Sequence, residues 1–394
     1  MNKLVSIVVA VLILCAGKNV SAQQAIQFEN IDISAALAKS KIIHKPVFLM
    51  CYASWCAHCN KMKAEVFTDS LVAGFYNRYF ICVKQDMEKG AGVQLHETFK
   101  IKSYPTFIFF NSDSIMIYRT AGEFKAAEFI AEGVNALTPA KHIPFLKQQF
   151  EKDTSNPNIC YDYLRALKKA DLDYTHVVDQ YFATQSETAL LSEINWRIIA
   201  NGITDINSRE FQFVLHHQKE FAALASPERV ERKIYYLVKD LLTPFIIAKD
   251  TVGYAVYRKP ATAIKIHEID SLVFICDLQL DEYVKNWDAY KKQSLQSAQI
   301  FIYNEYSELN AVAKVYLEQI IDKAALAQAI HWVDRSLLLH EEYSTYLLNA
   351  KLRLKINDIT GSIEKLKQAK QLALKYGWDF SEAEQLLKKY DKPK

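Results

Sequence analysis

The run Cys56-Ala-His-Cys59 contains two cysteines, and their type and spacing make them the clearest candidates for chemistry in this sequence. A C-x-x-C pair at the start of a helix can open and close one disulfide bond. The apolar run 47–52 before the pair predicts a buried strand, and residues 60–66 after it predict a helix. The cysteines should therefore lie on a strand-to-helix turn, where the unsatisfied N–H groups of the first helical turn stabilise a thiolate.

A structural zinc site is the other chemistry that this spacing allows, and it needs four ligands. The sequence has no second C-x-x-C and no H-x-x-x-H, and His96 and the adjacent pair His216-His217 are isolated from the cysteines. We therefore expect a redox dithiol, with no metal and no cofactor.

Residues 1–22 read as a cleaved secretory signal. Lys3 precedes an apolar run over residues 4–16, and Val20-Ser-Ala22 is a small-residue end. An uncleaved anchor is the alternative, and Leu14 before Cys15 disfavours a lipoprotein signal. No later segment has the roughly 18 apolar residues of a spanning helix. We expect an exported, periplasmic protein with no stable membrane span after signal removal.

The composition does not favour nucleic acid or an anionic surface as a partner. The chain has 394 residues, which suggests two or three domains, and a formal net charge of +3. No basic run with interleaved aromatic residues occurs, so nucleic acid is not an expected partner.

Cys51 and Cys82 lie in apolar strand-like runs and should be core residues. Cys160 and Cys276 lie in helical patterns, and a bridge between them is an open alternative.

The first 140 residues alternate strand and helix patterns. After a candidate edge strand at residues 26–28, the helices and strands are predicted, in chain order, at residues 32–41 with Asp32 as the cap, 47–52, 60–66, 69–79, 80–84, 92–100, 106–110, 115–118 and 126–137. Such an order is typical of an α/β sandwich of one domain.

This order of elements, with Trp55 directly before the cysteine pair and the later Tyr104-Pro-Thr106, resembles thioredoxin. Lys45-Pro46, Cys59-Asn-Lys-Met62 and Glu65-Val-Phe-Thr-Asp69 are similar to exported thioredoxin-like proteins related to the C-terminal domain of the DsbD family. The resemblance covers about residues 23–137, and we place this domain at residues 23–140.

The resemblance implies a role for each matching residue. Cys56 would be the exposed nucleophile and Cys59 the buried resolving thiol. Pro105 would be cis, so that the backbone of Tyr104 can pair with an extended substrate. Trp55 would form the lip around Cys56, and Gly122 would close the substrate groove. His58 would lower the Cys56 pKa, as the matching histidine does in the disulfide isomerase and DsbA families.

One position departs from thioredoxin. Thioredoxin has a buried aspartate on the active-site strand, six residues before the first cysteine, which helps to move the proton of the resolving thiol. Met50 occupies that position here. We still expect thiol exchange, but without this aspartate fast thioredoxin-like reduction is less expected.

Residues 141–394 carry apolar side chains at helical spacing and almost no strand alternation, which predicts an all-helical domain. Near the end, Ala329-Ile330, Val333 and Ser336 align with Ser362-Ile363, Leu366 and Ala369 at an offset of 33 residues. This helical repeat is similar to tetratricopeptide helix pairs, whose grooves bind peptides or proteins. The middle of this half resembles the helical extension of Bacteroidetes-type exported thioredoxin-like proteins.

Two functions compete. The first is a periplasmic thiol-disulfide oxidoreductase that acts on protein disulfides or dithiols, with a membrane electron donor or acceptor as a further candidate partner. Its helical half would recruit substrates. The second is a binding or scaffold protein in which the helical repeats bind partners and the thioredoxin-like domain is a recognition module. The intact Cys56 and Cys59 pair favours the first.

Overall fold

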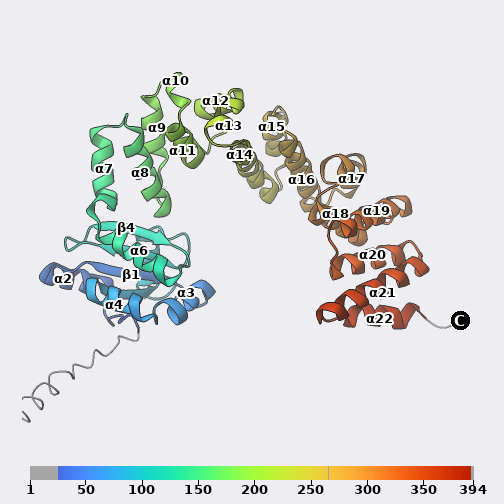
Figure 1. The fold of residues 1–394 in the computed structure, drawn as a ribbon, viewed down its shortest axis with the longest axis horizontal. Coiled ribbons are helices and arrows are strands. Elements are labelled where there is room, and N and C mark those ends of the chain that lie inside the picture. The colour runs from blue at the N-terminus through green and yellow to red at the C-terminus, as the bar shows by residue number, and fades with distance from the viewer. Residues whose placement is uncertain (1–24, 265, 392–394) are drawn as a thin grey trace, which may run out of the picture. The chain divides into compact units, whose positions relative to one another are not determined.

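A computed structural model of the chain describes residues 25–264 and 266–391. The chain divides into two compact units, one that ends at Ile203 and one that begins at Thr204 (Figure 1). The predicted signal, residues 1–22, lies outside the described residues. Within those residues, none of the helices has both the length and the apolar character needed to cross a bilayer.

A four-stranded mixed sheet is the centre of the first unit. Its strands run in the order β2-β1-β3-β4, with β1 parallel to β2 and antiparallel to β3, and with β3 antiparallel to β4. Their bounds are β1 Val47–Tyr52, β2 Ile81–Asp86, β3 Thr106–Phe110 and β4 Met116–Ala121. Cys51 lies opposite Thr106, so the end of β1 adjoins the start of β3. The predicted edge strand at 26–28 is only an isolated bridge between Phe28 and Cys82.

Both faces of the sheet are covered, which is why β1 is an uninterrupted apolar run rather than an alternating one. One face packs on helices α2 and α5, and the other on α3, the π-helix η1, α4 and α6. These elements are α2 Ile33–Ile43, α3 Ala57–Lys61, η1 Met62–Val66, α4 Ser70–Tyr79, α5 Gly92–Thr98 and α6 Ala126–Leu137. The helix predicted after the cysteines is thus a short α-helix that continues as a π-turn.

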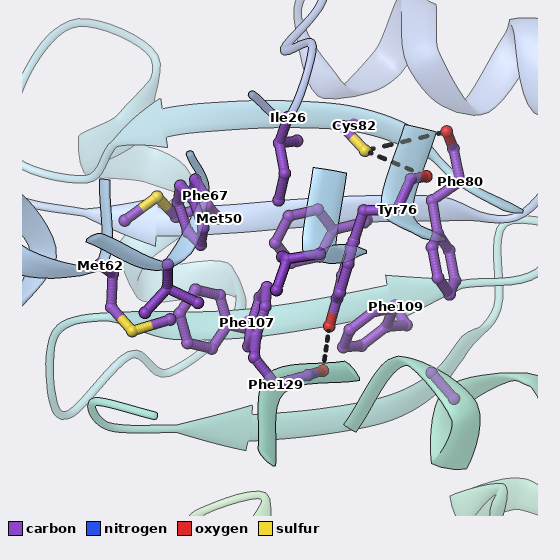
Figure 2. Packing of buried hydrophobic residues seen from close by; sticks show 14 of the residues in the cluster. Ile26, Met50, Met62, Phe67, Tyr76, Phe80, Cys82, Phe107, Phe109 and Phe129 are labelled. Carbon is purple, nitrogen blue, oxygen red and sulfur yellow. Dashed lines mark hydrogen bonds between the residues drawn. The ribbon is translucent and has the colours of Figure 1, made fainter. Parts of the chain in front are cut away.

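Aromatic side chains fill the face that carries the cysteines. Figure 2 shows Tyr76 of α4 lying flat against Phe129 of α6, with ring centroids 4.5 Å apart. The Tyr76 hydroxyl donates to the Phe129 carbonyl at 2.8 Å, which satisfies a buried polar group. Phe107 and Phe109 of β3 pack beneath them. Truncating one of these buried rings to alanine should cost about 3–5 kcal/mol.

Short polar residues begin the helices that the sequence predicted. Asp32 caps α2 by accepting from the Ala35 amide at 2.7 Å. Asp69 caps α4 by accepting from the amides of Leu71 and Val72. Such N-caps each contribute about 1 kcal/mol.

Five further helices belong to the first unit. They follow a short 3₁₀ turn, η2 Pro139–Lys141, and are α7 Ile143–Lys152, α8 Pro157–Lys169, α9 Thr175–Ala183, α10 Glu187–Leu190 and α11 Glu193–Gly202. Helices α7 and α8 pack against β4. The predicted division at residue 140 lies inside this unit and stays a prediction.

A buried carboxylate joins α8 to the sheet domain. Glu132 of α6 accepts from the Tyr118 hydroxyl at 2.7 Å and from Lys169 Nζ at 2.6 Å. Glu132 is almost fully buried, and its ion-pair partner Lys169 lies beyond residue 140. Lys102 also pairs with Asp171 at 3.1 Å.

The second unit is all helical over its described residues, as predicted. Its helices are α12 Arg209–His216, α13 Gln218–Leu224, α14 Pro227–Ala248, α15 Thr251–Thr262, α16 His267–Tyr283, α17 Trp287–Phe301, α18 Tyr306–Gln319, α19 Lys323–Leu339, α20 Tyr343–Lys355, α21 Ile359–Tyr376 and α22 Ser381–Tyr390. The 33-residue offset places equivalent buried positions in α19 and α21, such as Val333 and Leu366. Consecutive helices pack on one another from α18 to α22.

Candidate active site

The two cysteines lie where the chain leaves β1 and enters α3. Cys56 is the N-cap of α3, and its sulfur accepts a hydrogen bond from the Cys59 amide at 3.1 Å. The two residues form a disulfide, with Cα atoms 5.3 Å apart. An N-cap sulfur faces the N–H groups of the first helical turn, and these groups stabilise a thiolate once the disulfide is reduced.

The two cysteines differ little in exposure in this disulfide form. Cys56 is 4% exposed and Cys59 is fully buried. The sequence predicted an exposed Cys56, whereas in this disulfide form Cys56 is buried. The reason is local: its sulfur is bonded to Cys59 and turned toward the helix amides.

Trp55 forms an exposed platform beside Cys56. Trp55 is 70% exposed, and its indole N–H donates to Glu88 Oε2 at 2.6 Å. Tyr104 packs edge-on to the Trp55 ring at 6.1 Å between centroids. Glu88, in the loop after β2, was not anticipated from the sequence, because a contact across 33 residues leaves no local pattern.

Tyr104, Pro105 and Gly122 come together at the start of β3. The Tyr104–Pro105 peptide bond is cis, as the resemblance predicted. The Gly122 amide donates to the Pro105 carbonyl at 2.9 Å, and Gly122 has φ of 106°, a conformation that favours glycine. Since Thr106 is paired with both Cys51 and Ala121, this corner adjoins the end of the active-site strand.

His58 points to a carboxylate that the sequence reading missed. Its Nδ1 lies 2.8 Å from Glu123 Oε2, and Lys61 Nζ lies 2.5 Å from Glu123 Oε1. Hydrogen bonds from His58 and then from Lys61 lower the pKa of Glu123. The sequence did contain a hint of this carboxylate. His58 and Lys61 are three residues apart on a helix and share a face, and two basic groups on one face favour a common acidic partner.

Met50 occupies the buried position beneath the cysteines. It is fully buried and belongs to the same apolar cluster as Cys56, Cys59 and Met62. A thioether cannot accept the proton of the resolving thiol, so the chain has no acid at that position. The other cysteines of residues 25–264 and 266–391, Cys51, Cys82, Cys160 and Cys276, are free and buried.

A cysteine pair closed into a disulfide at a helix N-terminus, on an α/β sandwich with a cis-proline, is the arrangement of a thiol-disulfide oxidoreductase. The thioredoxin-like domain family matches residues 33–136. Thioredoxin-1 of Drosophila yakuba is 31% identical over 93 residues, which are 23% of this chain and 82% of that protein. Thioredoxin-1 of Drosophila melanogaster is 30% identical over the same shares. The chain belongs to the thioredoxin family.

Solved structures of this type are also similar to the domain. A candidate disulphide-isomerase from Bacteroides thetaiotaomicron is 35% identical and covers 29% of this chain and 94% of its own, with a TM-score of 0.27. The DsbD C-terminal domain from Neisseria meningitidis is 24% identical and covers 27% of this chain and 95% of its own, with a TM-score of 0.24. The predicted fold class, an α/β thioredoxin fold followed by an all-α part, is confirmed.

Proposed function

We propose that this thiol-disulfide oxidoreductase exchanges disulfides with protein substrates in the periplasm or another exported compartment. The observation that carries the proposal is the Cys56–Cys59 disulfide at the N-terminus of α3, beside the exposed ring of Trp55. The predicted signal at residues 1–22 supports export, and an oxidising compartment suits a disulfide enzyme.

In the proposed cycle Cys56 is the attacking thiol. As a thiolate, Cys56 attacks a substrate disulfide, forms a mixed disulfide and releases one substrate thiolate. Cys59 then attacks the Cys56 sulfur, which regenerates the protein disulfide and releases the second substrate thiolate. The substrate leaves with two more electrons, and a membrane electron donor would restore the dithiol. With a membrane acceptor the same steps run in the opposite direction.

Substrate contact is assigned to the residues around the pair. Trp55 offers an exposed ring, while Tyr104 and Pro105 offer main-chain groups to an extended segment. Gly122 closes the same corner, and a side chain there would be strained by its positive φ. His58 is assigned the tuning of the Cys56 pKa.

An insulin-reduction assay with dithiothreitol tests the activity. Wild-type protein should accelerate precipitation of the insulin chains, and Cys56→Ser should not. A Cys59→Ser variant should accumulate mixed disulfides on Cys56, because the resolving thiol is gone. The trapped proteins identify the substrates, and failure to trap any thiol protein would contradict the assignment of Cys56.

We further propose that the helical half, assigned to residues 141–394, recruits substrates through a groove between α18, α20 and α22. The groove encloses about 480 Å³ and has an apolar wall of Leu317, Leu347 and Leu348. Asn310 Nδ2 donates to Thr345 Oγ1 at 2.8 Å. Asn310 also lines the groove, and its buried Oδ1 has no partner among the described residues.

The groove also motivates the alternative, a scaffold protein whose helical repeats bind partners. Asn310→Ala combined with Leu348→Ala separates the two. For an oxidoreductase that recruits through the groove, the double variant should trap fewer proteins and still reduce a small disulfide at the wild-type rate. If Cys56→Ser leaves the biological role intact while the groove variant abolishes it, the scaffold reading holds instead.

A further inference from the structure

We infer that Glu123 is a positioning residue for the dithiol. Glu123 fixes His58, and its carboxylate offsets the positive charge that His58 and Lys61 bring to the start of the helix. The inference rests on the proposed redox role of Cys56 and Cys59.

Glu123 uses each of its carboxylate oxygens for a different cation. Oε2 lies 2.8 Å from His58 Nδ1, and Oε1 lies 2.5 Å from Lys61 Nζ. The Glu123 side chain is only 29% exposed, whereas that of His58 is 70% exposed. The carboxylate is therefore the better-packed partner, and it restricts an imidazole that would otherwise move freely in solvent.

The backbone on both sides of Glu123 is tied to the site. Before it, the Gly122 amide donates to the carbonyl of Pro105. After it, the Phe124 amide lies 3.3 Å from the sulfur of Met62, in the π-turn that continues the cysteine helix. These contacts hold the loop between the cis-proline corner and the helix that carries Cys59, so the position of the carboxylate is set by the active-site scaffold.

The direction of the effect on the dithiol follows from a charge count. A carboxylate that accepts from His58 Nδ1 requires a proton on that nitrogen. Replacing Glu123 by glutamine removes one negative charge, and His58 can respond by losing at most one proton. Since Lys61 keeps its charge, the net charge near Cys56 cannot become more negative, and in general it becomes more positive. Positive charge near Cys56 stabilises its thiolate.

A stabilised thiolate favours the reduced protein. Two glutathione thiols reduce the Cys56–Cys59 disulfide to two protein thiols and form one glutathione disulfide, so two electrons and two protons pass to the protein. The Cys56 thiol then releases its proton to solvent when the pH exceeds its pKa. Glu123→Gln should shift this equilibrium about three- to tenfold toward the reduced form, where tenfold corresponds to about 30 mV.

The experiment is redox equilibration with glutathione, together with thiolate absorbance at 240 nm against pH. In Glu123→Gln the Cys56 thiolate should appear at lower pH than in wild type. Glu65→Gln is the matched control, because it removes an exposed charge one turn beyond Lys61 that makes no bond to His58. It should shift the equilibrium less than about twofold, and Glu123→Asp should return it to near wild type.

A double-mutant cycle links the effect to His58. In a His58→Ala background the Glu123→Gln shift should be at least as large as in the wild-type background, because no imidazole remains to offset the lost negative charge by releasing a proton. A clearly smaller shift in the His58→Ala background than in the wild-type background, or no shift in Glu123→Gln, would overturn the inference. If wild-type protein does not equilibrate with glutathione at all, the proposed redox function fails instead. Circular dichroism of each variant confirms that it is folded, and Lys61→Gln provides a second variant, which should shift the equilibrium toward the disulfide.

Discussion

The dithiol site and the C-terminal helical unit use polar side chains in opposite ways. At the dithiol, Trp55, His58 and Lys61 are more than half exposed at the rim. In the helical unit, Asp277 of α16 is nearly buried and accepts from the Tyr254 hydroxyl and from two nitrogens of Arg258. Exposed polar groups at the end of an element remain available to a substrate, whereas buried, fully bonded ones fix how helices pack.

The cysteines show a related contrast, between a helix start and positions inside an element. Cys56 is the N-cap of a helix in the first unit. Cys276 lies within α16, where burial and then the charge of Asp277 raise its pKa to about 12. Burial raises the pKa of Cys82 and of Cys160 to about 12 as well. Residue type is identical in all of these, so backbone position and solvation decide which thiol can react.

The largest expected effect compares one cysteine from each region. Cys56→Ala should lower insulin reduction by about three orders of magnitude or more, because the nucleophile is lost. Cys276→Ala should leave the rate within about twofold, with a stability loss of about 1 kcal/mol. Comparable losses of activity in both variants would show that the helical unit takes part in the chemistry.

Truncation tests whether the sheet domain stands alone. A chain of residues 23–140 should reduce a small disulfide, but it should be less stable than residues 23–203 by about 1–3 kcal/mol, because the buried Glu132 loses Lys169. Urea unfolding of both measures the difference. Should the shorter chain be inert while the longer one is active, helices α7–α11 belong to the catalytic unit.

A point substitution isolates that contact. In the chain of residues 23–203, Lys169→Ala should cost about 1 kcal/mol, since Lys169 is partly exposed. Lys147→Ala, which removes an exposed pair with Glu151 on α7, should cost less than about 0.5 kcal/mol. Equal costs would mean that burial of Glu132 contributes nothing.

The charge at His58 should set the redox poise. An imidazolium near Cys56 stabilises the thiolate and makes the protein a stronger oxidant, so its potential should lie above thioredoxin's value of about −270 mV and toward the isomerase range of about −180 mV. His58→Ala should lower the potential by about 10–30 mV, as read from glutathione equilibration. A wild-type value at or below thioredoxin's would favour a reductase fed by a membrane donor.

Alkylation against pH sharpens the same comparison. One thiol of the reduced protein, Cys56, should titrate below the free-cysteine value of about 8.5. The buried thiols, including Cys276, should react only after unfolding, because burial raises their pKa. A single transition near 8.5 would remove the electrostatic argument for Cys56.

The smallest expected effect lies in the helical unit. Burial and then the charge of Asp277 raise the pKa of Asp281 to about 6, although Gln293 donates to it at 3.0 Å. Since this folded-state pKa exceeds the unfolded value, the unfolded chain binds fewer protons between about pH 4 and 6, and stability falls as the pH rises through that window.

Asp281→Asn should therefore stabilise the full chain by about 1 kcal/mol at pH 7.5, after allowance for solvent screening. The gain should vanish near pH 4, where Asp281 is protonated in the folded protein. Glu282→Gln, an exposed neighbour, is the control. Thermal unfolding from pH 4 to 8 measures both, and a gain that does not depend on pH would contradict the assignment.

Local sequence was sufficient to locate the chemistry. The apolar run of β1, the C-x-x-C pair and the helix after it are contiguous, so their periodicity and caps identify a dithiol at a helix start. Asp32, Asp69 and the bounds of α6 were readable for the same reason. The division into an α/β domain and a helical half followed from the change of period after residue 137, which needs no knowledge of contacts.

Only the tertiary structure decided what surrounds the dithiol. Glu88 reaches Trp55 across 33 residues and Glu123 reaches His58 across 65. Lys169 joins α8 to a carboxylate buried against β4, a contact that the predicted division at residue 140 does not include. Periodicity reports which face of an element is apolar, and it contains no information about which distant loop or helix covers that face. The identity of the reacting atoms is therefore local, whereas the charge around them and the size of the folding unit depend on long-range packing.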